Sequence, residues 1–224
     1  KEGLENSWGA NIGSTLLKGC DNAETQARAW AAAGSDARMN GCEMPVVIVS
    51  GSGNQGITAS VPVWRYGTLM GKDEETILRA VTLSDLITIH QKTGIGRLSA
   101  YCGAVSAGVG AGCGIAWLRG AGYEGIAATL QNAVAMISGC ICDGAKASCA
   151  AKIAMGVECG ILELSETVLL RTPFGSWSYE KREPPYLAYN TYVEEIPNVG
   201  AFFPVVFQRR IPPHQRGCRP DASA

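Results

Sequence analysis

A mainly α-helical domain, rich in glycine and alanine and followed by an irregular C-terminal tail, is the fold that the sequence predicts. Apolar residues recur at helical spacing after Asp73, as a helix with one buried face requires. Residues 100–118 carry no charge and consist largely of glycine and alanine, which suits a helix buried on all sides. No succession of strands is apparent, so a sheet-based fold is not expected.

The first predicted helix covers residues 8–33. Residues 43–50, which include MPVVIV, should be extended and lead into the loop SGSGNQG at 50–56. A second helix is expected over 57–66, with Pro62 either kinking it or lying in its first turn, because proline lacks the N–H that a helix interior uses. The core contacts of the first helix should be Leu16, Leu17, Ala27 and Trp30.

The next helix should begin at Asp73, where consecutive acidic residues favour a helix start. Further helices are expected over 104–118, 123–137 and 147–164. Interior glycines in a helix cost about 1 kcal/mol each relative to alanine, so they are expected where the backbone approaches another helix or a cofactor. The helix over 104–118 has four, at Gly108, Gly110, Gly112 and Gly114. Their position just after Cys102 favours the cofactor.

Composition excludes some classes of function. The formal net charge is −1 and the basic residues form no long run, so nucleic acid is not an expected partner. Residues 100–118 are long enough to span a membrane, but insertion favours large aliphatic side chains over glycine, so no membrane span is expected. Nine cysteines, an odd number, and no recognisable secretory signal predict a reducing, cytoplasmic setting.

Three cysteines carry most of the functional signal: Cys102, Cys142 and Cys149. The last two are separated by six residues, which is neither the usual zinc spacing nor a redox CxxC. Thiolates are the usual ligands of iron–sulfur clusters, and three of them leave one iron free to bind a substrate. This constellation suggests such a cluster.

Three segments give the constellation a specific context: SGSGNQG at 50–56, HQKTGIGRLSAYCG at 90–103 and ICDGAKASCAAK at 141–152. Over about residues 1–160 the chain resembles the iron–sulfur L-cysteine desulfidases and the alpha-chain region of bacterial L-serine dehydratases, and is most similar to the desulfidase-like branch. It corresponds to the C-terminal half of a full-length member.

The resemblance implies that Cys102, Cys142 and Cys149 hold a 4Fe–4S cluster, without pyridoxal phosphate. The implied reaction converts L-cysteine to pyruvate, ammonia and sulfide, with the open iron activating the leaving group. An L-serine dehydratase alpha-type subunit is the alternative. In desulfidases the proton-abstracting cysteine is assigned to the N-terminal half, so the resemblance also implies a partner chain, or a homodimer, that supplies the missing half.

The loop at 50–56 supports two interpretations. Gly51, Gly53 and Gly56 form a GxGxxG pattern with Asp73 downstream, which is the fingerprint of a dinucleotide-binding oxidoreductase if a strand precedes it and a helix follows. The competing interpretation is a loop of N–H groups and small polar side chains that binds a carboxylate. By resemblance, this loop lines the substrate site. Its side chains would be Ser50, Ser52 and Asn54.

Other polar residues near the cysteines are candidates for catalysis. His90 lies upstream of Cys102 and would orient a ligand or move a substrate proton, although a hydrogen-bonded structural histidine is the more ordinary interpretation. Lys146 lies between Cys142 and Cys149 and is the favoured cation for a substrate carboxylate or for the cluster charge. An exposed salt bridge is the alternative for it. The same two roles are open to Lys92 and Arg97.

The predicted domain boundaries are 1–165 for the cluster domain and 166–224 for the tail. Residues 171–224 hold most of the prolines and show no helical period, so poor order is expected there. The resemblance ends near Glu158. The tail is therefore either a divergent extension or the product of a shifted reading frame, and the abrupt loss of resemblance favours the shift.

Overall fold

The computed structural model describes residues 1–20, 22–96 and 99–162. The predicted tail at 166–224 and Arg97 lie outside these residues. Within them the chain is helical, with two isolated β-bridges and no named strand. The prediction of a mainly α-helical domain is confirmed. The helices are α1 (Glu2–Glu5), α2 (Ile12–Gly19), α3 (Ala23–Met39), α4 (Gly53–Leu69), α5 (Glu74–Ile95), α6 (Gly103–Leu118), α7 (Tyr123–Met136) and α8 (Ser148–Leu162).

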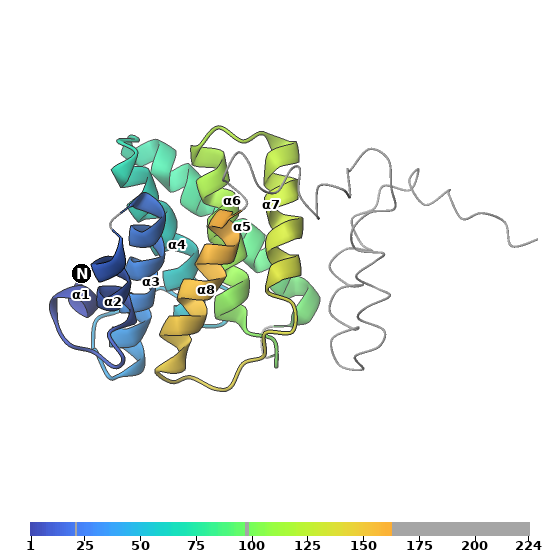
Figure 1. Cartoon of the computed structure of the whole chain (residues 1–224). Helices are drawn as coiled ribbons and strands as arrows, with labels where there is room; N and C mark the ends of the chain where they lie inside the picture. The colour runs from blue at the N-terminus through green and yellow to red at the C-terminus, as the bar shows by residue number, and fades with distance from the viewer. Residues whose placement is uncertain (21, 97–98, 163–224) are drawn as a thin grey trace, which may run out of the picture.

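Helix α6 is the centre of the fold. It packs against α4, α5, α7 and α8, and nearly all of its residues are buried. In Figure 1, α8 lies in front of α6, with α3 on one side and α7 on the other. This arrangement explains why residues 100–118 carry no charge, since a helix surrounded by neighbours has no face for water. No helix in the described part of the chain is long and apolar enough to cross a membrane.

The four glycines of α6 are explained by contacts between helices. Gly108 and Gly112 lie against the backbone of Gly156 and Gly160 in α8. A Cβ atom at Gly112 would stand 2.4 Å from the carbonyl oxygen of Gly160, so no larger residue fits there. On the opposite side, Gly110 and Gly114 lie against the backbone and the small side chains of α5. The interpretation that these glycines make room for a cofactor is therefore wrong, because neighbouring helices fill the space.

The N-terminal segment differs from its prediction. The single helix expected over 8–33 is two helices, α2 and α3. Helix α3 begins after Asn22, whose side chain accepts a hydrogen bond from the Thr25 N–H at 2.7 Å. Asp36 of α3 is fully buried and accepts from the Ile12 N–H at 2.9 Å, which fixes the start of α2. The Asn22 side chain caps the N-terminus of α3 and so marks a new helix start inside the segment that was predicted to be a single helix.

The region around the glycine-rich loop also differs. Residues 42–48 belong to no helix or strand, and Val49 and Ser52 form one isolated bridge. Helix α4 begins at Gly53, four residues before the predicted 57, so part of the predicted loop is the first turn of a helix. Pro62 lies buried in the interior of α4 and not in its first turn. The predicted start of α5 is confirmed, with Asp73 as its N-cap.

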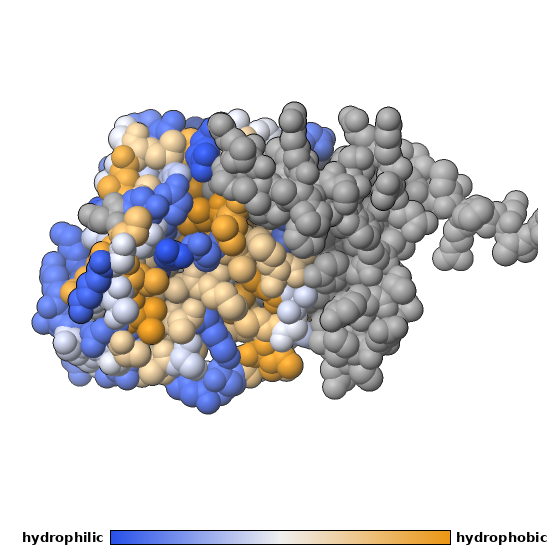
Figure 2. Space-filling view, viewed as in Figure 1, coloured by the Kyte–Doolittle hydropathy of each residue, from blue (hydrophilic) through white to orange (hydrophobic). Residues whose placement is uncertain are grey.

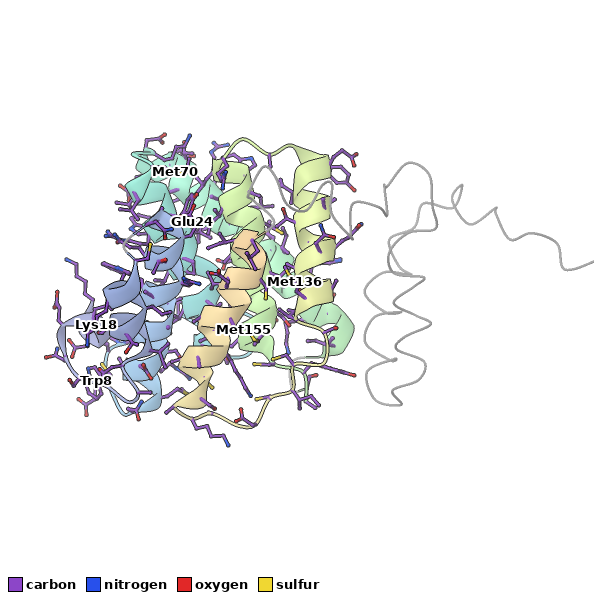
Figure 3. The ribbon with its side chains drawn as sticks, viewed as in Figure 1. Trp8, Lys18, Glu24, Met70, Met136 and Met155 are labelled. Carbon is purple, nitrogen blue, oxygen red and sulfur yellow. The ribbon has the colours of Figure 1, made fainter. Side chains whose placement is uncertain are left out.

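Helix α8, the last helix of the described chain, packs against both helix α3 and the central helix α6. On the α3 side, Arg28 and Glu158 form an ion pair. Figure 2 shows residues of hydrophobic character gathered over this part of the surface, between more hydrophilic regions. Met155 of α8, labelled in Figure 3, belongs to this surface and is 43% exposed.

We expect Gly112→Ala to lower the free energy of unfolding by roughly 1–3 kcal/mol, because the added methyl group meets the α8 backbone, which has little freedom to move. The measurement is urea unfolding followed by circular dichroism. Gly19→Ala is the matched control, since nothing lies within 4 Å of its Cβ position. That variant should keep or slightly raise stability. Equal stability of Gly112→Ala and wild type would contradict the close packing of α6 and α8.

Candidate functional site: a thiol-bearing ladder at the start of α6

Two segments far apart in the sequence pair immediately before α6. Tyr101 and Ile141 form an antiparallel bridge. The Cys102 N–H donates to the Cys140 carbonyl at 3.1 Å, and the Cys142 N–H donates to the Ala100 carbonyl at 2.6 Å. These hydrogen bonds place residues 100–102 opposite residues 140–142. The short ladder is the structural basis of the site.

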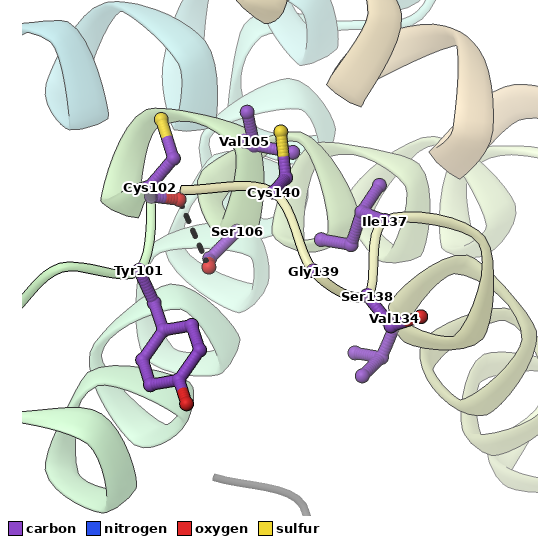
Figure 4. Close-up of a pocket in the computed structure, with 9 residues that line it drawn as sticks. All are labelled: Tyr101, Cys102, Val105, Ser106, Val134, Ile137, Ser138, Gly139 and Cys140. Carbon is purple, nitrogen blue, oxygen red and sulfur yellow. Dashed lines mark hydrogen bonds between the residues drawn. The ribbon is translucent and has the colours of Figure 1, made fainter. Parts of the chain in front are cut away.

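The ladder gathers three thiols on one face. Side chains alternate between the two faces of an extended segment, so Cys140 and Cys142 lie on the same face, opposite Ile141. Cys102 faces Cys140 across the ladder. Figure 4 shows the sulfur atoms of Cys102 and Cys140 on the same side and the ring of Tyr101 on the other. We call Cys102, Cys140 and Cys142 the thiol face.

Burial and position set the electrostatics of this face. Cys102 is 6% exposed and is the N-cap residue of α6, whereas Cys142 is exposed. Burial raises the pKa of the Cys102 thiol, and the neighbouring Cys140 and Cys142 raise it further, while the backbone N–H groups of the first turn of α6 act in the opposite direction. Those N–H groups favour negative charge at this position.

Lys92 of α5 brings a buried positive charge to the thiol face. The residue is 3% exposed, and burial lowers the pKa of its ammonium group. The Cys102 and Cys142 thiols lie close enough to oppose that effect. Within the described part of the chain, no carboxylate lies within ion-pair distance of Lys92. A buried ammonium without a carboxylate needs another negative or polar partner, since removing the charge from water is costly.

The start of α4 lies against the start of α6. The amide group of Gln55 packs on Gly103, where an added Cβ would stand 2.6 Å from Nε2. Gln55 is 4% exposed, and its Oε1 is buried with no hydrogen-bond partner among the described residues. The glycine-rich segment at 50–56 is therefore adjacent to Cys102, although about fifty residues separate them in the sequence.

The three predicted substrate-binding residues lie in this segment and have structural contacts. Ser50 has a left-handed backbone with φ 49°. Ser52 is the N-cap of α4 and accepts from the Gln55 N–H at 3.2 Å. Asn54 is 5% exposed and accepts from Arg38 Nη1 at 3.1 Å. Their roles in substrate binding stay predictions.

The segment between Cys142 and α8 holds the other predicted groups. Lys146 is exposed and lies 3.5 Å from the Asp143 carboxylate. Asp143 also accepts from Ser148 and Lys152, and the Lys152 ammonium holds the pKa of its carboxyl group well below the usual range. Cys149 is 7% exposed in the first turn of α8, with its Sγ 3.7 Å from the Gly144 carbonyl oxygen.

His90 is an exposed residue of α5. Its carbonyl accepts from the Thr93 hydroxyl at 2.6 Å. Its predicted catalytic role, like that of Lys146, stays a prediction.

The predicted cluster ligands are only partly assembled. Their chemistry suits iron, and Cys102 and Cys142 share the thiol face. However, no three His, Cys, Asp or Glu side chains of the described residues are arranged so that they could hold a metal ion. Cys102, Cys142 and Cys149 thus have the right donor atoms for a cluster, but the three thiols are not placed close enough together to bind one metal site.

A small pocket lies beside the ladder (Figure 4). Its lining comes from the ladder, the first turn of α6 and the end of α7 with the residues that follow it: Tyr101, Cys102, Val105, Ser106, Val134, Ile137, Ser138, Gly139 and Cys140. The pocket has room for about one water molecule, which is too little for an amino acid. The substrate of any enzyme built on this site would have to bind elsewhere on the thiol face.

Comparison with known proteins decides the family. The family model described as serine dehydratase alpha chain matches residues 1–166. The chain belongs to the serine dehydratase alpha chain family. UPF0597 proteins of Desulfitobacterium hafniense and Lachnoclostridium phytofermentans are each 58% identical to it over 163 residues, or 72% of this chain. A UPF0597 protein of Finegoldia magna is 49% identical over 160 residues, or 71% of this chain.

The chain covers only part of these relatives. The matched region is 38% of the D. hafniense and F. magna proteins and 39% of the L. phytofermentans protein. No solved structure matches the chain.

The family and the fold leave little support for dinucleotide binding. The fingerprint requires a strand before the glycines. The described residues have no such strand there, and Gly53 and Gly56 pack against Arg38 and the Val47 carbonyl. Lys92 and Gln55 are the polar residues that the structure brings to the site most clearly. The sequence indicated Lys92 only as one of several cations, and no sequence signal pointed to Gln55, since its contact with Gly103 is a tertiary one.

We expect Ser52→Ala to lower the free energy of unfolding by about 1 kcal/mol, because it removes the side-chain cap of α4. Thermal and urea unfolding measure the change. Ser52→Asn is the matched control, since asparagine caps helices as well as serine does and should retain most of the stability. If Ser52→Asn were as unstable as Ser52→Ala, the loss would not come from the cap.

Proposed function

We propose that this chain is the cluster-binding part of a lyase that removes the β-substituent of a small amino acid. The observation that carries the proposal is the buried Lys92 ammonium beside the Cys102 and Cys142 thiols at the start of α6. Membership of the serine dehydratase alpha chain family supports the reaction class. The family match favours L-serine as substrate, and L-cysteine is the second candidate.

Cys102, Cys142 and Cys149 would hold a 4Fe–4S cluster. Cys102 is fixed by the ladder and by α6, whereas Cys142 lies on an exposed segment. Closing the set therefore requires the segment at 142–148 to bring Cys149 toward the thiol face. When bound, the cluster supplies an iron without a protein ligand, which acts as a Lewis acid toward the β-substituent.

The residues around the thiol face would bind the polar groups of the substrate. Lys92 and the first-turn N–H groups of α6 offer positive charge for a carboxylate. The Gln55 amide, buried against Gly103, offers a further hydrogen-bonding group next to them. These groups are held by helices and not by a loop, so they orient a substrate at little entropic cost.

The base that removes the Cα proton would come from outside this chain. The relatives are much longer than the matched region, and a partner chain or the remainder of the longer protein would supply it. The isolated chain should therefore take up an oxygen-sensitive cluster but form little pyruvate. Addition of the missing part should restore pyruvate formation. If the isolated chain forms pyruvate rapidly, the base lies within it, and His90 is the first residue to replace.

The decisive experiment is anaerobic reconstitution of the chain with iron and sulfide. We expect about four irons per chain, since a 4Fe–4S cluster fills the site, and the visible absorption of such a cluster. Cys102→Ser, Cys142→Ser and Cys149→Ser should each lose most of it. Cys113→Ser is the control, because Cys113 lies buried within α6, where burial raises its pKa to about 12 and keeps it protonated. Full iron content in the three variants would refute this ligand set.

A second prediction concerns Lys92. We expect Lys92→Met to weaken binding of L-serine or L-cysteine to the reconstituted chain by roughly 10- to 100-fold, because a charge-assisted hydrogen bond contributes about 1.5–3 kcal/mol. Isothermal titration calorimetry under nitrogen measures it. Stability should be unchanged or higher, since methionine removes a buried charge without leaving a cavity.

Two variants control this experiment. Lys92→Arg should retain part of the affinity because it keeps the charge, and Lys72→Met changes an exposed lysine and should have no effect. Unchanged affinity in Lys92→Met would exclude the proposed contact with the carboxylate.

A further inference from the structure

Cys140 is the member of the thiol face to which the proposed function gives no role. It faces Cys102 directly across the ladder, and the Cys102 N–H donates to its carbonyl oxygen at 3.1 Å. Both cysteines are free in the structure, and Figure 4 shows their sulfur atoms projecting to the same side. Their placement depends on the Tyr101–Ile141 bridge, so it is a property of the folded backbone.

The geometry of this pair is suited to a disulfide. Cys102 and Cys140 are directly opposed beside the Tyr101–Ile141 bridge and share one hydrogen bond. Directly opposed residues of antiparallel segments have Cα atoms about 4.5–5.5 Å apart. Disulfides span Cα separations of about 4.4–6.8 Å, so the ladder would not have to move to accommodate the bond. Cys142 lies diagonally across from Cys102, which is a longer span. Cys113 is buried within α6, about three helical turns beyond Cys102, which places it roughly 15 Å further along the helix axis.

We propose that Cys102 and Cys140 form a reversible disulfide when the metal-free chain meets a hydroperoxide. The inference goes beyond the proposed function, since it needs neither the cluster nor an amino-acid substrate.

The reaction would begin at Cys140, which is half-buried and more accessible than Cys102. The Lys152 ammonium donates to the adjacent Ile141 carbonyl at 3.1 Å, and it also forms an ion pair with Asp143, so its positive charge is partly balanced. The Cys140 thiolate attacks the peroxide, breaks the O–O bond and becomes a sulfenic acid, releasing hydroxide or the corresponding alcohol. The Cys102 thiol then displaces the sulfenic hydroxyl as water and forms the S–S bond. One peroxide is reduced and two thiols are oxidised, which balances the reaction.

The bond would have a consequence for the site. It occupies the Cys102 sulfur, so the oxidised chain would lack one of the three proposed cluster ligands until a thiol reduces it. Cys140 would thus protect Cys102 from irreversible oxidation while the cluster is absent. This consequence alone rests on the proposed function.

The test is peptide mapping of the metal-free, reduced chain after treatment with equimolar hydrogen peroxide. Free thiols are blocked and the protein is cleaved with trypsin, which separates residues 98–119 from residues 120–146. We expect these two peptides to be joined in the wild type, with the loss of two hydrogen atoms, and released by dithiothreitol. Cys102→Ser and Cys140→Ser should abolish the joined peptide, and Cys140→Ala should do the same.

The matched controls are Cys113→Ser and Cys142→Ser. Each removes the other cysteine of the same tryptic peptide, so each should keep the joined product. Persistence of the product in Cys140→Ser, or its absence from the oxidised wild type, would overturn the proposal.

A second arm separates this inference from the proposed function. After peroxide treatment, wild type should fail to take up iron until it is reduced, whereas Cys140→Ser should retain most of its capacity if residual peroxide is removed at once. If neither protein takes up iron even when reduced, the cluster proposal fails and the mapped disulfide stands. If oxidised wild type with the joined peptide takes up a full cluster, Cys102 is not a ligand.

Discussion

The structure depends on how closely α6 approaches its neighbours. Gly108 and Gly112 let its backbone meet that of α8, and Gly110 and Gly114 do the same toward α5. Each glycine costs about 1 kcal/mol in helix propensity, which the packing of α6 against its four neighbouring helices offsets. Because α6 is enclosed along its length, the orientation of its N-terminus is fixed. That end of the helix is where the thiol face begins.

Rigid placement matters for the chemistry because the site concentrates groups that are costly to bury. Lys92 is a buried cation, and Cys102 is a buried thiol whose pKa is raised mainly by loss of water. The Cys102 and Cys142 thiols oppose in part the effect of burial on the pKa of Lys92, and a substrate carboxylate or a negatively charged cofactor would balance its charge. The short pairing of residues 100–102 with residues 140–142 then places the Cys140 and Cys142 thiols beside Cys102. The site is therefore a meeting of two helix starts and one short pair of extended segments.

Much of the fold could be predicted from the sequence. The start of α5 follows from Asp73 and the apolar period after it, and the course of α6 follows from its uncharged composition. The errors lie at helix boundaries. The division between α2 and α3, and the early start of α4 at Gly53, each depend on one capping side chain, Asn22 or Ser52. A single side-chain hydrogen bond leaves no trace in an apolar period, and the glycines around Ser52 made a helix start look like a loop.

The sequence by itself determined that the described part of the chain is helical, that Cys102, Cys142 and Cys149 have a spacing that resembles an iron–sulfur family, and that the helix over 104–118 is largely buried. Such features are encoded by residue type at fixed local separations. Only the tertiary structure decided that Gln55 lies on Gly103, that Lys92 is buried beside Cys102, and that Cys140 faces Cys102. These contacts join residues that are distant or differently oriented along the chain. They exist because the packing of α4, α5 and α8 around α6 brings their ends together, and no local pattern specifies that arrangement.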